Sequence, residues 1–434
     1  MKTLMTASGV LTAAAAFAAT PIVSNVTMSQ EKATRTVTIT YRLAEPGVVT
    51  LDIETNTTGT ASGSAYASIG GRHVQNLSGD VNKLVRTAGE HTITWHPDAS
   101  WNGFKFTEPV VRPVVQFWAT NNPPWYMVVD LTVKSNCTYY AAADFVPLGV
   151  SNAIYKTDKM IMRRIPAKGV RARMGTPSGE PASSYSYKYA DGATITAANN
   201  EVPHFMTLTY DYYMAIYELT MMQYKRMGGN PDSSIGYGTQ GWERKPFEKC
   251  NVVWFRGEQA ADHYLWPKCG HEVKEGYALD RLRKFTGLVE WDLPTEAEWE
   301  FACRAGTSTG FNNGGEGDSS AAVSAVAWFS DNSGSAAHEV GLKDPNAWGL
   351  YDMHGNVGEY CLDWYSYGDA YSDGSDAVDG VGIQKAHTDS RHVKRGGHYK
   401  TGSTYLRSGF RGDFVYTGAT DTEGYRLRCE AVAR

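Results

Sequence analysis

The sequence has no long apolar run beyond its N-terminal segment, no excess of basic residues and few cysteines. Its 434 residues include 41 Lys+Arg against 46 Asp+Glu, a formal net charge of −5, and six Cys. No stretch after the N-terminus approaches the ~18 consecutive apolar residues of a membrane helix. A slightly acidic chain also lacks the positive charge that binds nucleic acid or anionic membranes without specificity. The sequence therefore predicts neither a nucleic-acid partner nor a membrane span.

What is abundant is glycine and aromatic residues. The chain contains 44 Gly, 12 Trp, 26 Tyr and 14 Phe, with 20% charged and 42% hydrophobic residues. These proportions are typical of a folded globular protein, and the length predicts two or three domains at about 100–200 residues each. Helical bundles avoid Gly, so the composition favours a loop-rich fold held by large side chains.

The first 18 residues have the pattern of an export signal. Lys2 supplies the positive charge, Leu4 to Phe17 are apolar and rich in Ala, and Ala16-Phe17-Ala18 provides the small-x-small cleavage pattern. A buried N-terminal helix is the alternative, but no cap or amphipathic pattern supports it. We therefore expect a cleaved signal peptide at 1–18 and a secreted or periplasmic protein, in an oxidising compartment where disulfides can form.

Residues 34–135 alternate with period two. Val37, Ile39, Tyr41 and Leu43 alternate with polar residues, and the pattern returns around 49–53, 91–95 and 127–133. Such alternation buries one face of each strand, and many such strands separated by turns indicate a β-sandwich. The runs at 41–47 and 88–95 resemble the immunoglobulin-like domain of flagellar hook-capping proteins and many exported bacterial proteins. This resemblance implies a spacer or docking module without chemistry of its own.

A complete short helix is predicted at 295–304. Thr295 is the expected N-cap, Glu298 completes a capping box, and Gly306 is the expected left-handed residue after the helix. Glu296 and Glu298 are expected to complement the positive helix N-terminus. On these grounds alone the helix is structural.

Several ordered motifs then carry a second resemblance. They are LPTEAEWEFACRAG at 293–306, NAWGLYDMHGNVGEY at 346–360, RGGHY at 395–399, RSGFR at 407–411 and GYRLR at 424–428. Together they closely resemble the formylglycine-generating enzyme family, also called the sulfatase-modifying factor family, over residues 155–434. The resemblance implies an α+β, C-type-lectin-like fold with little regular secondary structure. Residues 136–154 are then the linker that follows the sandwich.

The resemblance also shows what the chain lacks. In the oxidases of this family, two cysteines soon after an Arg-Gly-Gly-Ser motif bind copper(I) as thiolates, and a substrate cysteine becomes formylglycine at the expense of O₂. Here no cysteine lies between Cys361 and Cys429, His398 replaces the Ser, and Gly358 replaces the Trp of the family's GNVWEW pattern. Copper is therefore not expected, and cysteine oxidation is disfavoured.

Whether the chain is an enzyme stays open at this stage. In the nonheme-iron branch of the superfamily, the resemblance implies a three-His iron site that uses an H-x-x-x-H-x-E helix. This sequence lacks that motif. The alternative to a binding protein is a divergent enzyme of that superfamily with an unassigned oxidative reaction. Its candidate catalytic residues are His398, Tyr399 and Arg407. The alternative for Arg407 and Arg411 is that they are structural anchors for loop carbonyls, and this is the favoured interpretation.

The resemblance implies a structural Ca²⁺ in the segment 352–359. The position of Asp352 supplies a side-chain oxygen, those of Gly355 and Val357 supply carbonyls, and that of Glu359 supplies a carboxylate. Crowded oxygen ligands suit Ca²⁺. A turn tied by Asp and Asn side chains to backbone amides explains the same residues, and both interpretations remain.

Two disulfides are candidates. Cys303 and Cys429 match approximately a pair that is bridged in some family members, and Cys250 with Cys269 would close a second loop. Buried free thiols are the alternative.

The segment 399–423 is rich in Thr, Ser, Gly, Asp, Tyr and Phe, a composition typical of adaptable binding loops. In relatives with this fold the same C-terminal surface binds ligands. The predicted function is an exported, non-oxidase member of the family that binds a protein or glycan of unknown identity. Its expected binding face contains Gly358, His398, Thr401, Tyr405 and Arg411.

Overall fold

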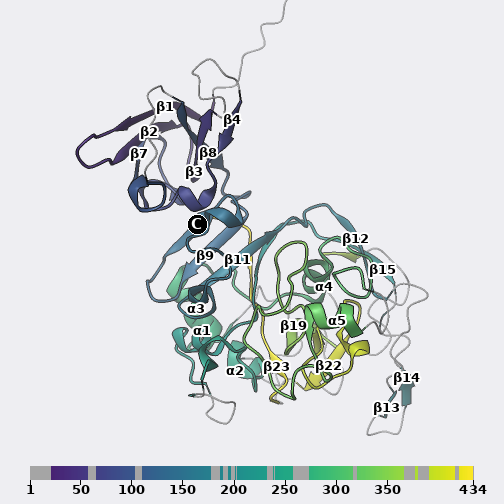
Figure 1. Ribbon diagram of the computed structural model, residues 1–434. Helices are drawn as coiled ribbons and strands as arrows, with labels where there is room; N and C mark the ends of the chain where they lie inside the picture. Colours follow the sequence, from purple (N-terminus) through teal and green to yellow (C-terminus); the bar gives the residue numbers. More distant parts are fainter. Residues whose placement is uncertain are drawn as a thin grey trace, which may run out of the picture.

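The protein was analysed as a computed structural model (Figure 1). It describes residues 21–56, 65–102, 110–176, 186–188, 194–196, 201, 203–231, 238, 240–257, 273–315, 320–365, 377–379, 391–415 and 420–433. The predicted signal peptide at 1–18 and Cys269 lie outside the described residues. Within the described ranges, no helix is long and apolar enough to cross a membrane.

The N-terminal part consists of two β-sheets that share one core (Figure 1). The first sheet has the order β1 (Val23–Gln30), β2 (Val37–Leu43), β7 (Gly89–Trp95), β5 (Leu77–Gly79). In the second, β3 (Gly47–Asn56) pairs with β4 (Tyr66–Ser68), β6 (Lys83–Val85) and β8 (Val111–Trp118). The predicted alternation on β2 is confirmed, because Val37, Ile39, Tyr41 and Leu43 are all buried.

The second part is built on a five-stranded antiparallel sheet. Its order is β10 (Cys137–Tyr140), β9 (Tyr126–Asp130), β11 (Lys159–Ile165), β16 (Tyr212–Ala215), β24 (Arg428–Glu430). Because β24 lies close to the C-terminus, the end of the chain closes this sheet against strands formed much earlier. Both faces carry apolar side chains, including Met162 and Tyr213 on one face and Ile161 and Tyr212 on the other.

The structure places the junction of the two parts earlier than the sequence pattern did. The strand predicted at 127–133 for the N-terminal sandwich is β9, and it pairs with β10 and β11 instead. The segment 136–154, predicted as a linker, contains β10, one 3₁₀ turn at 143–145 and the start of another at 153–156. Period-two alternation indicates that a strand has one buried face, but it does not indicate which sheet the strand joins.

The remaining strands form small sheets, and the helices are short. β22 (Gly412–Val415), β21 (Arg391–Arg395), β19 (Gly358–Trp364) and β23 (Glu423–Gly424) form a four-stranded sheet in that order. Smaller groups are β12 (Arg171–Met174), β15 (His204–Thr207) and β20 (Ala377–Val378); β13 (Ser186–Lys188) and β14 (Thr194–Thr196); β17 (Ala327–Trp328) and β18 (His354–Gly355). The helices are α1 (Met221–Arg226), α2 (Val252–Arg256), α3 (Ala278–Thr286), α4 (Glu296–Arg304) and α5 (Ser320–Val326). The 3₁₀ turns are η1 (Gly71–His73), η2 (Pro97–Ala99), η3 (Ala143–Phe145), η4 (Ala153–Lys156), η7 (Trp242–Arg244) and η9 (Ser403–Leu406). This mixture of strands and few helices agrees with the predicted α+β class with little regular structure.

Helix α4 confirms the predicted capping box. The Glu298 amide donates to Thr295 Oγ1 at 3.1 Å, and the Thr295 amide donates to Glu298 Oε2 at 2.8 Å. At the other end, Ala305 already adopts the left-handed conformation with φ 45°, one residue before the predicted Gly306, whose φ is 93°.

Every residue of α4 is buried, including its three glutamates. Glu296 binds Arg411, Glu298 binds Arg428, and Glu300 binds Arg304 and Arg395. Three of these arginines come from the last forty or so residues of the chain. The helix is therefore the acidic centre on which the C-terminal segments are assembled.

Candidate functional site

The predicted binding face lies on a loop that is anchored at both ends by buried arginines. At its start, Arg395 is fully buried, and its guanidinium donates to Glu300, to the Ser408 carbonyl at 2.7 Å and to the Gly409 carbonyl at 3.1 Å. At its end, Arg407 donates to the Thr404 carbonyl at 3.0 Å and pairs with Glu201 at 3.1 Å. Buried charge-assisted bonds of this kind hold a backbone in one geometry.

Between these anchors the loop faces solvent. His398, Thr401, Ser403, Thr404 and Tyr405 are partly exposed, and Lys400 and Gly402 are exposed. Lys400 forms an exposed ion pair with Asp421 at 2.7 Å, and the Tyr405 ring stands edge-on against Phe410 with 5.3 Å between centroids. We call residues 398–405 the anchored loop. The structure thus brings His398, Thr401 and Tyr405 together.

The other two residues predicted for the face are buried beneath it. Arg411 donates to both carboxylate oxygens of Glu296, with Nη2 to Oε2 at 2.8 Å, so its role is structural but its partner is a helix carboxylate and not the loop carbonyl that was expected. Gly358 lies on β19, which pairs with β21 just before the loop.

The three candidate catalytic side chains are each held by other groups. His398 Nδ1 accepts from the Lys400 amide at 3.2 Å, the Tyr399 hydroxyl donates to the Asp421 carbonyl at 2.9 Å, and Arg407 is bound as described. Burial, together with the nearby Lys394 and Lys400, lowers the pKa of His398 to about 3. A neutral imidazole with so low a pKa is a weak general base at neutral pH.

The family pattern has Trp at the position of Gly358. In this protein a lysine side chain occupies the space that a larger residue there would need. A Cβ atom on Gly358 would lie 2.7 Å from Lys394 Cδ, so the lysine stem occupies the space of a larger side chain. Lys394 Nζ then pairs with the buried Glu423 at 2.6 Å. The space beside Gly358 is therefore filled by the stem of the lysine in this ion pair.

We expect Gly358→Trp to lower the free energy of unfolding by about 3 kcal/mol, because the indole displaces Lys394 and leaves the Glu423 carboxylate buried without its partner. Urea unfolding followed by fluorescence measures the change. Adding Lys394→Ala and Glu423→Gln should recover part of the loss, whereas adding Lys400→Ala, an exposed lysine on the loop, should recover none. Wild-type stability for the single variant would show that the space is not filled as described.

The cysteines do not provide a thiolate site within the described residues. Burial raises the pKa of Cys303 and of Cys137 to about 12, and raises those of Cys250, Cys361 and Cys429 as well. Copper(I) binding and nucleophilic attack both need the thiolate. Cys250, Cys303, Cys361 and Cys429 behave instead as small buried hydrophobic groups, and Cys137 is partly buried.

The predicted Cys303–Cys429 disulfide is not formed, since both residues are free thiols. Cys303 packs in the α4 cluster, with its Sγ 3.5 Å from Ser408 Oγ, whereas Cys429 packs in the cluster on the opposite side of the five-stranded sheet. Cys250 is also a free thiol whose Sγ donates to the Glu423 carbonyl at 3.2 Å. Its predicted partner, Cys269, lies outside the described residues.

One of the four predicted calcium ligands, Glu359, is already bound by protein groups. Glu359 accepts from Arg426 Nη2 at 2.7 Å and from Trp299 Nε1 at 2.6 Å, which uses its carboxylate. The Val357 amide and the Asn356 side chain donate to Glu218, at 3.0 Å and 2.6 Å. The segment therefore points N–H groups at a buried carboxylate, whereas a cation needs oxygen donors.

Asp352 is the predicted ligand that keeps an available oxygen. Its Oδ2 accepts from the Gly341 amide at 2.6 Å, while its buried Oδ1 has no partner among the described residues. Burial raises the pKa of Asp352 to about 6. Across the same described ranges, no group of three His, Cys, Asp or Glu side chains is arranged to hold a metal ion.

Removing calcium is therefore expected to leave the protein unchanged. Excess chelator should leave Tm and the near-ultraviolet circular dichroism unaltered, because Arg426 already neutralises Glu359. Elemental analysis of the dialysed protein provides the independent check. A drop in Tm on chelation that added Ca²⁺ reverses would restore the calcium interpretation.

Sequence reasoning missed two buried carboxyl groups near the site. Glu218 accepts from the Val357 amide and the Asn356 side chain, but nothing in its sequence spacing indicates that it holds 356–357. Glu248 is buried beside Tyr399 and Asp421, and its Oε2 has no partner among the described residues. Burial raises the pKa of Glu248 to about 8, with Asp421 adding to the effect. No periodicity or motif marks Glu248 in the sequence.

Comparison with known proteins gives one family match. The FGE-sulfatase pattern, described as the Sulfatase-modifying factor enzyme 1-like domain, matches residues 184–431.

Two curated proteins have sequences that are similar to parts of this chain. The chain is 28% identical to the chaperone protein LppX of Paenibacillus barcinonensis, over 41% of this chain and 70% of that protein. It is 33% identical to the serine/threonine-protein kinase pkn1 of Chlamydia caviae, over 36% of this chain and 25% of the kinase. The match thus spans about a quarter of the kinase.

Two solved structures are similar over most of their length. The Treponema denticola variable protein 1 has 24% sequence identity and a TM-score of 0.45, over 63% of this chain and 95% of that one. PvdO from Pseudomonas aeruginosa has 23% identity and a TM-score of 0.45, over 62% of this chain and 94% of that one.

Proposed function

Since the chain belongs to the sulfatase-modifying factor enzyme 1-like family, whose pattern matches more than half of its residues, we propose that it uses the family scaffold to bind a protein or glycan and does not oxidise cysteine. The anchored loop, 398–405, is the proposed contact surface. The observation that carries this proposal is the combination of two buried arginine anchors with an exposed, Ser-, Thr- and Tyr-containing stretch between them.

A loop of this kind suits binding for an energetic reason. Ordering a mobile loop on association costs conformational entropy, and a loop that is already ordered avoids most of that cost. Tyr supplies a large contact area with few rotatable bonds, and Ser and Gly adapt their hydrogen bonds. Tyr405, held edge-on against Phe410, is the aromatic contact that the loop presents.

The chemistry of the site supports binding over oxidation. No cysteine lies between Cys361 and Cys429, and burial keeps the described thiols protonated at neutral pH. Thr401 shapes the turn in the loop, because its hydroxyl donates to the His398 carbonyl at 2.8 Å. These groups supply hydrogen bonds but no soft metal ligand.

Of the two ligand classes, a protein is the first to test. One relative is named as a chaperone, and we take from that name an unfolded polypeptide as the probe. Exposed lysine and acidic groups at the loop, Lys400 and Asp421, fit a mixed polar surface.

Binding is tested with a fluorescent, permanently unfolded protein, reduced and carboxymethylated α-lactalbumin, by anisotropy, and with a glycan array in parallel. We expect Tyr405→Ala to weaken whichever binding is found by about tenfold, the loss of a central aromatic contact. Tyr405→Phe should keep most of the affinity. Lys274→Glu, at an exposed lysine outside the loop, serves as the control and should have no effect.

Two outcomes would overturn the proposal. One is the absence of binding to both probes by a correctly folded protein. The other is copper-dependent O₂ consumption on a cysteine-containing peptide, which would return the chain to the oxidases.

We also propose that the protein is exported and that its two N-terminal sheets form an immunoglobulin-like docking module. The apolar segment up to Phe17 followed by Ala18 supports export, and the shared core of the two sheets supports the module. The mass of the protein recovered from the cell envelope or medium should correspond to cleavage after Ala18. A full-length mass together with a cytoplasmic location would exclude export.

A further inference from the structure

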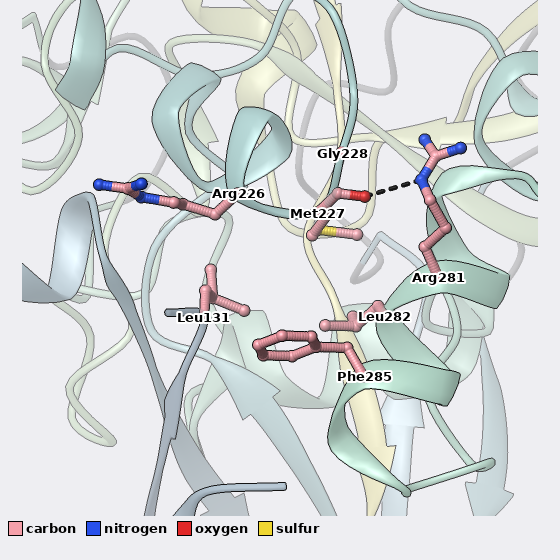
Figure 2. Close-up of a pocket in the computed structure, with 7 residues that line it drawn as sticks. All are labelled: Leu131, Arg226, Met227, Gly228, Arg281, Leu282 and Phe285. Atoms are coloured by element: carbon pink, nitrogen blue, oxygen red, sulfur yellow. Dashed lines mark hydrogen bonds between the residues drawn. The ribbon is translucent and has the colours of Figure 1, made fainter. Parts of the chain in front are cut away.

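A small apolar cavity lies away from the anchored loop, between the C-terminal end of α1, helix α3 and the turn after β9 (Figure 2). Its volume is about 240 Å³, and its apolar walls are Leu131, Met227, Leu282 and Phe285. Three of these side chains, those of Leu131, Met227 and Leu282, are buried. The cavity shares no residue with the anchored loop.

Two arginines line the same cavity, and they differ in how their charge is balanced. Arg226 is bound by the Asp158 carboxylate through Nε at 2.9 Å and Nη2 at 2.7 Å. Arg281 donates through Nε to the Met227 carbonyl at 2.8 Å, the bond drawn in Figure 2, and through Nη1 to the Gly276 carbonyl. Both of these acceptors are neutral.

The neighbouring carboxylate on α3, that of Asp280, interacts electrostatically with Arg281 but makes its direct contacts elsewhere. The Asp280 carboxylate accepts from the Gly276 amide at 2.7 Å and pairs with Lys284 at 3.1 Å. Among the residues that the structure describes, no carboxylate lies within ion-pair distance of Arg281. A guanidinium has five N–H donors, so Arg281 retains donors beyond the two bonds that hold it.

The size of the cavity limits what it can hold. It exceeds the ~150 Å³ of a dry apolar cavity that accepts benzene, and it is smaller than the ~300 Å³ at which sites for drug-sized molecules begin. A single ring with a short side chain, or a short branched chain, matches this range.

We propose that this cavity binds a small amphiphilic monoanion, with its compact apolar group among Leu131, Leu282 and Phe285 and its carboxylate on Arg281. The apolar walls favour the hydrophobic body. The guanidinium favours a carboxylate, because the two groups match in planar, paired hydrogen bonds. Arg226 contributes its aliphatic stem to the wall and no net charge.

The test uses the full chain and two probes of equal shape, 3-phenylpropanoate and its neutral amide, measured by isothermal titration calorimetry. We expect the acid to bind the wild-type protein about tenfold more tightly than the amide. In Arg281→Met the acid should lose that advantage while the amide binds as before. Arg226→Met is the matched control and should keep the preference, because Asp158 already neutralises Arg226.

A second measurement locates the site. In protein labelled at the methionine methyl groups, the acid should shift the Met227 resonance, identified by its loss in Met227→Leu. If Arg281→Met fails to fold, Arg281→Lys retains the charge and should retain most of the preference. Equal affinities of acid and amide for the wild type, no saturable binding of either up to about 10 mM, or an unshifted Met227 resonance would each overturn the proposal. None of these outcomes bears on the anchored loop.

Discussion

Arg395→Met lowers the free energy of unfolding by about 3–5 kcal/mol, the loss expected when one partner of a buried ion pair is removed. Arg395 is fully buried and binds Glu300, with Glu296 also 3.5 Å away. The methionine fills most of the space, but it removes one of the two arginines that bind the buried Glu300 and leaves the Ser408 and Gly409 carbonyls without this donor. Chemical denaturation with two probes, fluorescence and circular dichroism, measures the change.

The matched control is Lys400→Met, which removes a cation from the exposed middle of the same loop. Its ion pair with Asp421 is exposed, with side-chain exposures of 41% and 52%, so it should cost less than about 1 kcal/mol. Arg395→Lys should remain strongly destabilised, because a lysine cannot reproduce the forked contacts. If Arg395→Met cost no more than Lys400→Met, the anchoring of the loop by this arginine would be refuted.

Glu248→Gln makes the protein more stable than the wild type above about pH 8, with an advantage of a few kcal/mol, since one pKa unit corresponds to about 1.4 kcal/mol. Burial raises the pKa of Glu248 from 4.5 to about 8 in the folded protein. The folded state therefore holds this proton more tightly than the unfolded state, and wild-type stability falls as the pH rises from about 4.5 to about 8. Glutamine mimics the protonated acid, so the variant avoids that loss.

The measurement is the difference in unfolding free energy between variant and wild type at pH 5, 7 and 9. Burial also raises the pKa values of Asp352 and Glu218. Their contribution to the pH dependence of stability is the same in both proteins and cancels in the difference. Glu275→Gln is the control, because Glu275 is 88% exposed and its substitution should give a small difference that does not change with pH. A pH-independent difference for Glu248→Gln would contradict the assignment.

Local features of the fold could be predicted from the sequence because their causes are local. The capping box of α4 depends on residues three apart, and the alternating burial of β2 depends on neighbours two apart. The partners of the α4 glutamates could not be predicted. The sequence predicts that Glu296 and Glu298 complement the helix N-terminus, yet each also binds an arginine more than a hundred residues away.

Some features of the candidate site could likewise be predicted from the sequence, and others could not. His398, Thr401 and Gly358 were identified because they depart from or follow a family motif. The occupation of the Gly358 space by Lys394 depends on the pairing of β19 with β21, which no spacing in the sequence shows. Glu248 is recognisable only after folding, because a glutamate has an ordinary pKa until its surroundings exclude water.

The acidic helix α4 has a consequence for the order of events during synthesis. Its partners Arg395, Arg411 and Arg428 follow their glutamates by 95, 115 and 130 residues. At about 5–20 residues per second, the ribosome delivers them on the order of ten seconds after the helix itself. During that interval Glu296 and Glu298 cannot be buried without a large electrostatic cost, whereas Glu300 already has Arg304 on its own helix. The nascent domain must therefore remain open until the last strand emerges, and a chain released early, before Arg428, should be recognised and degraded as unfolded.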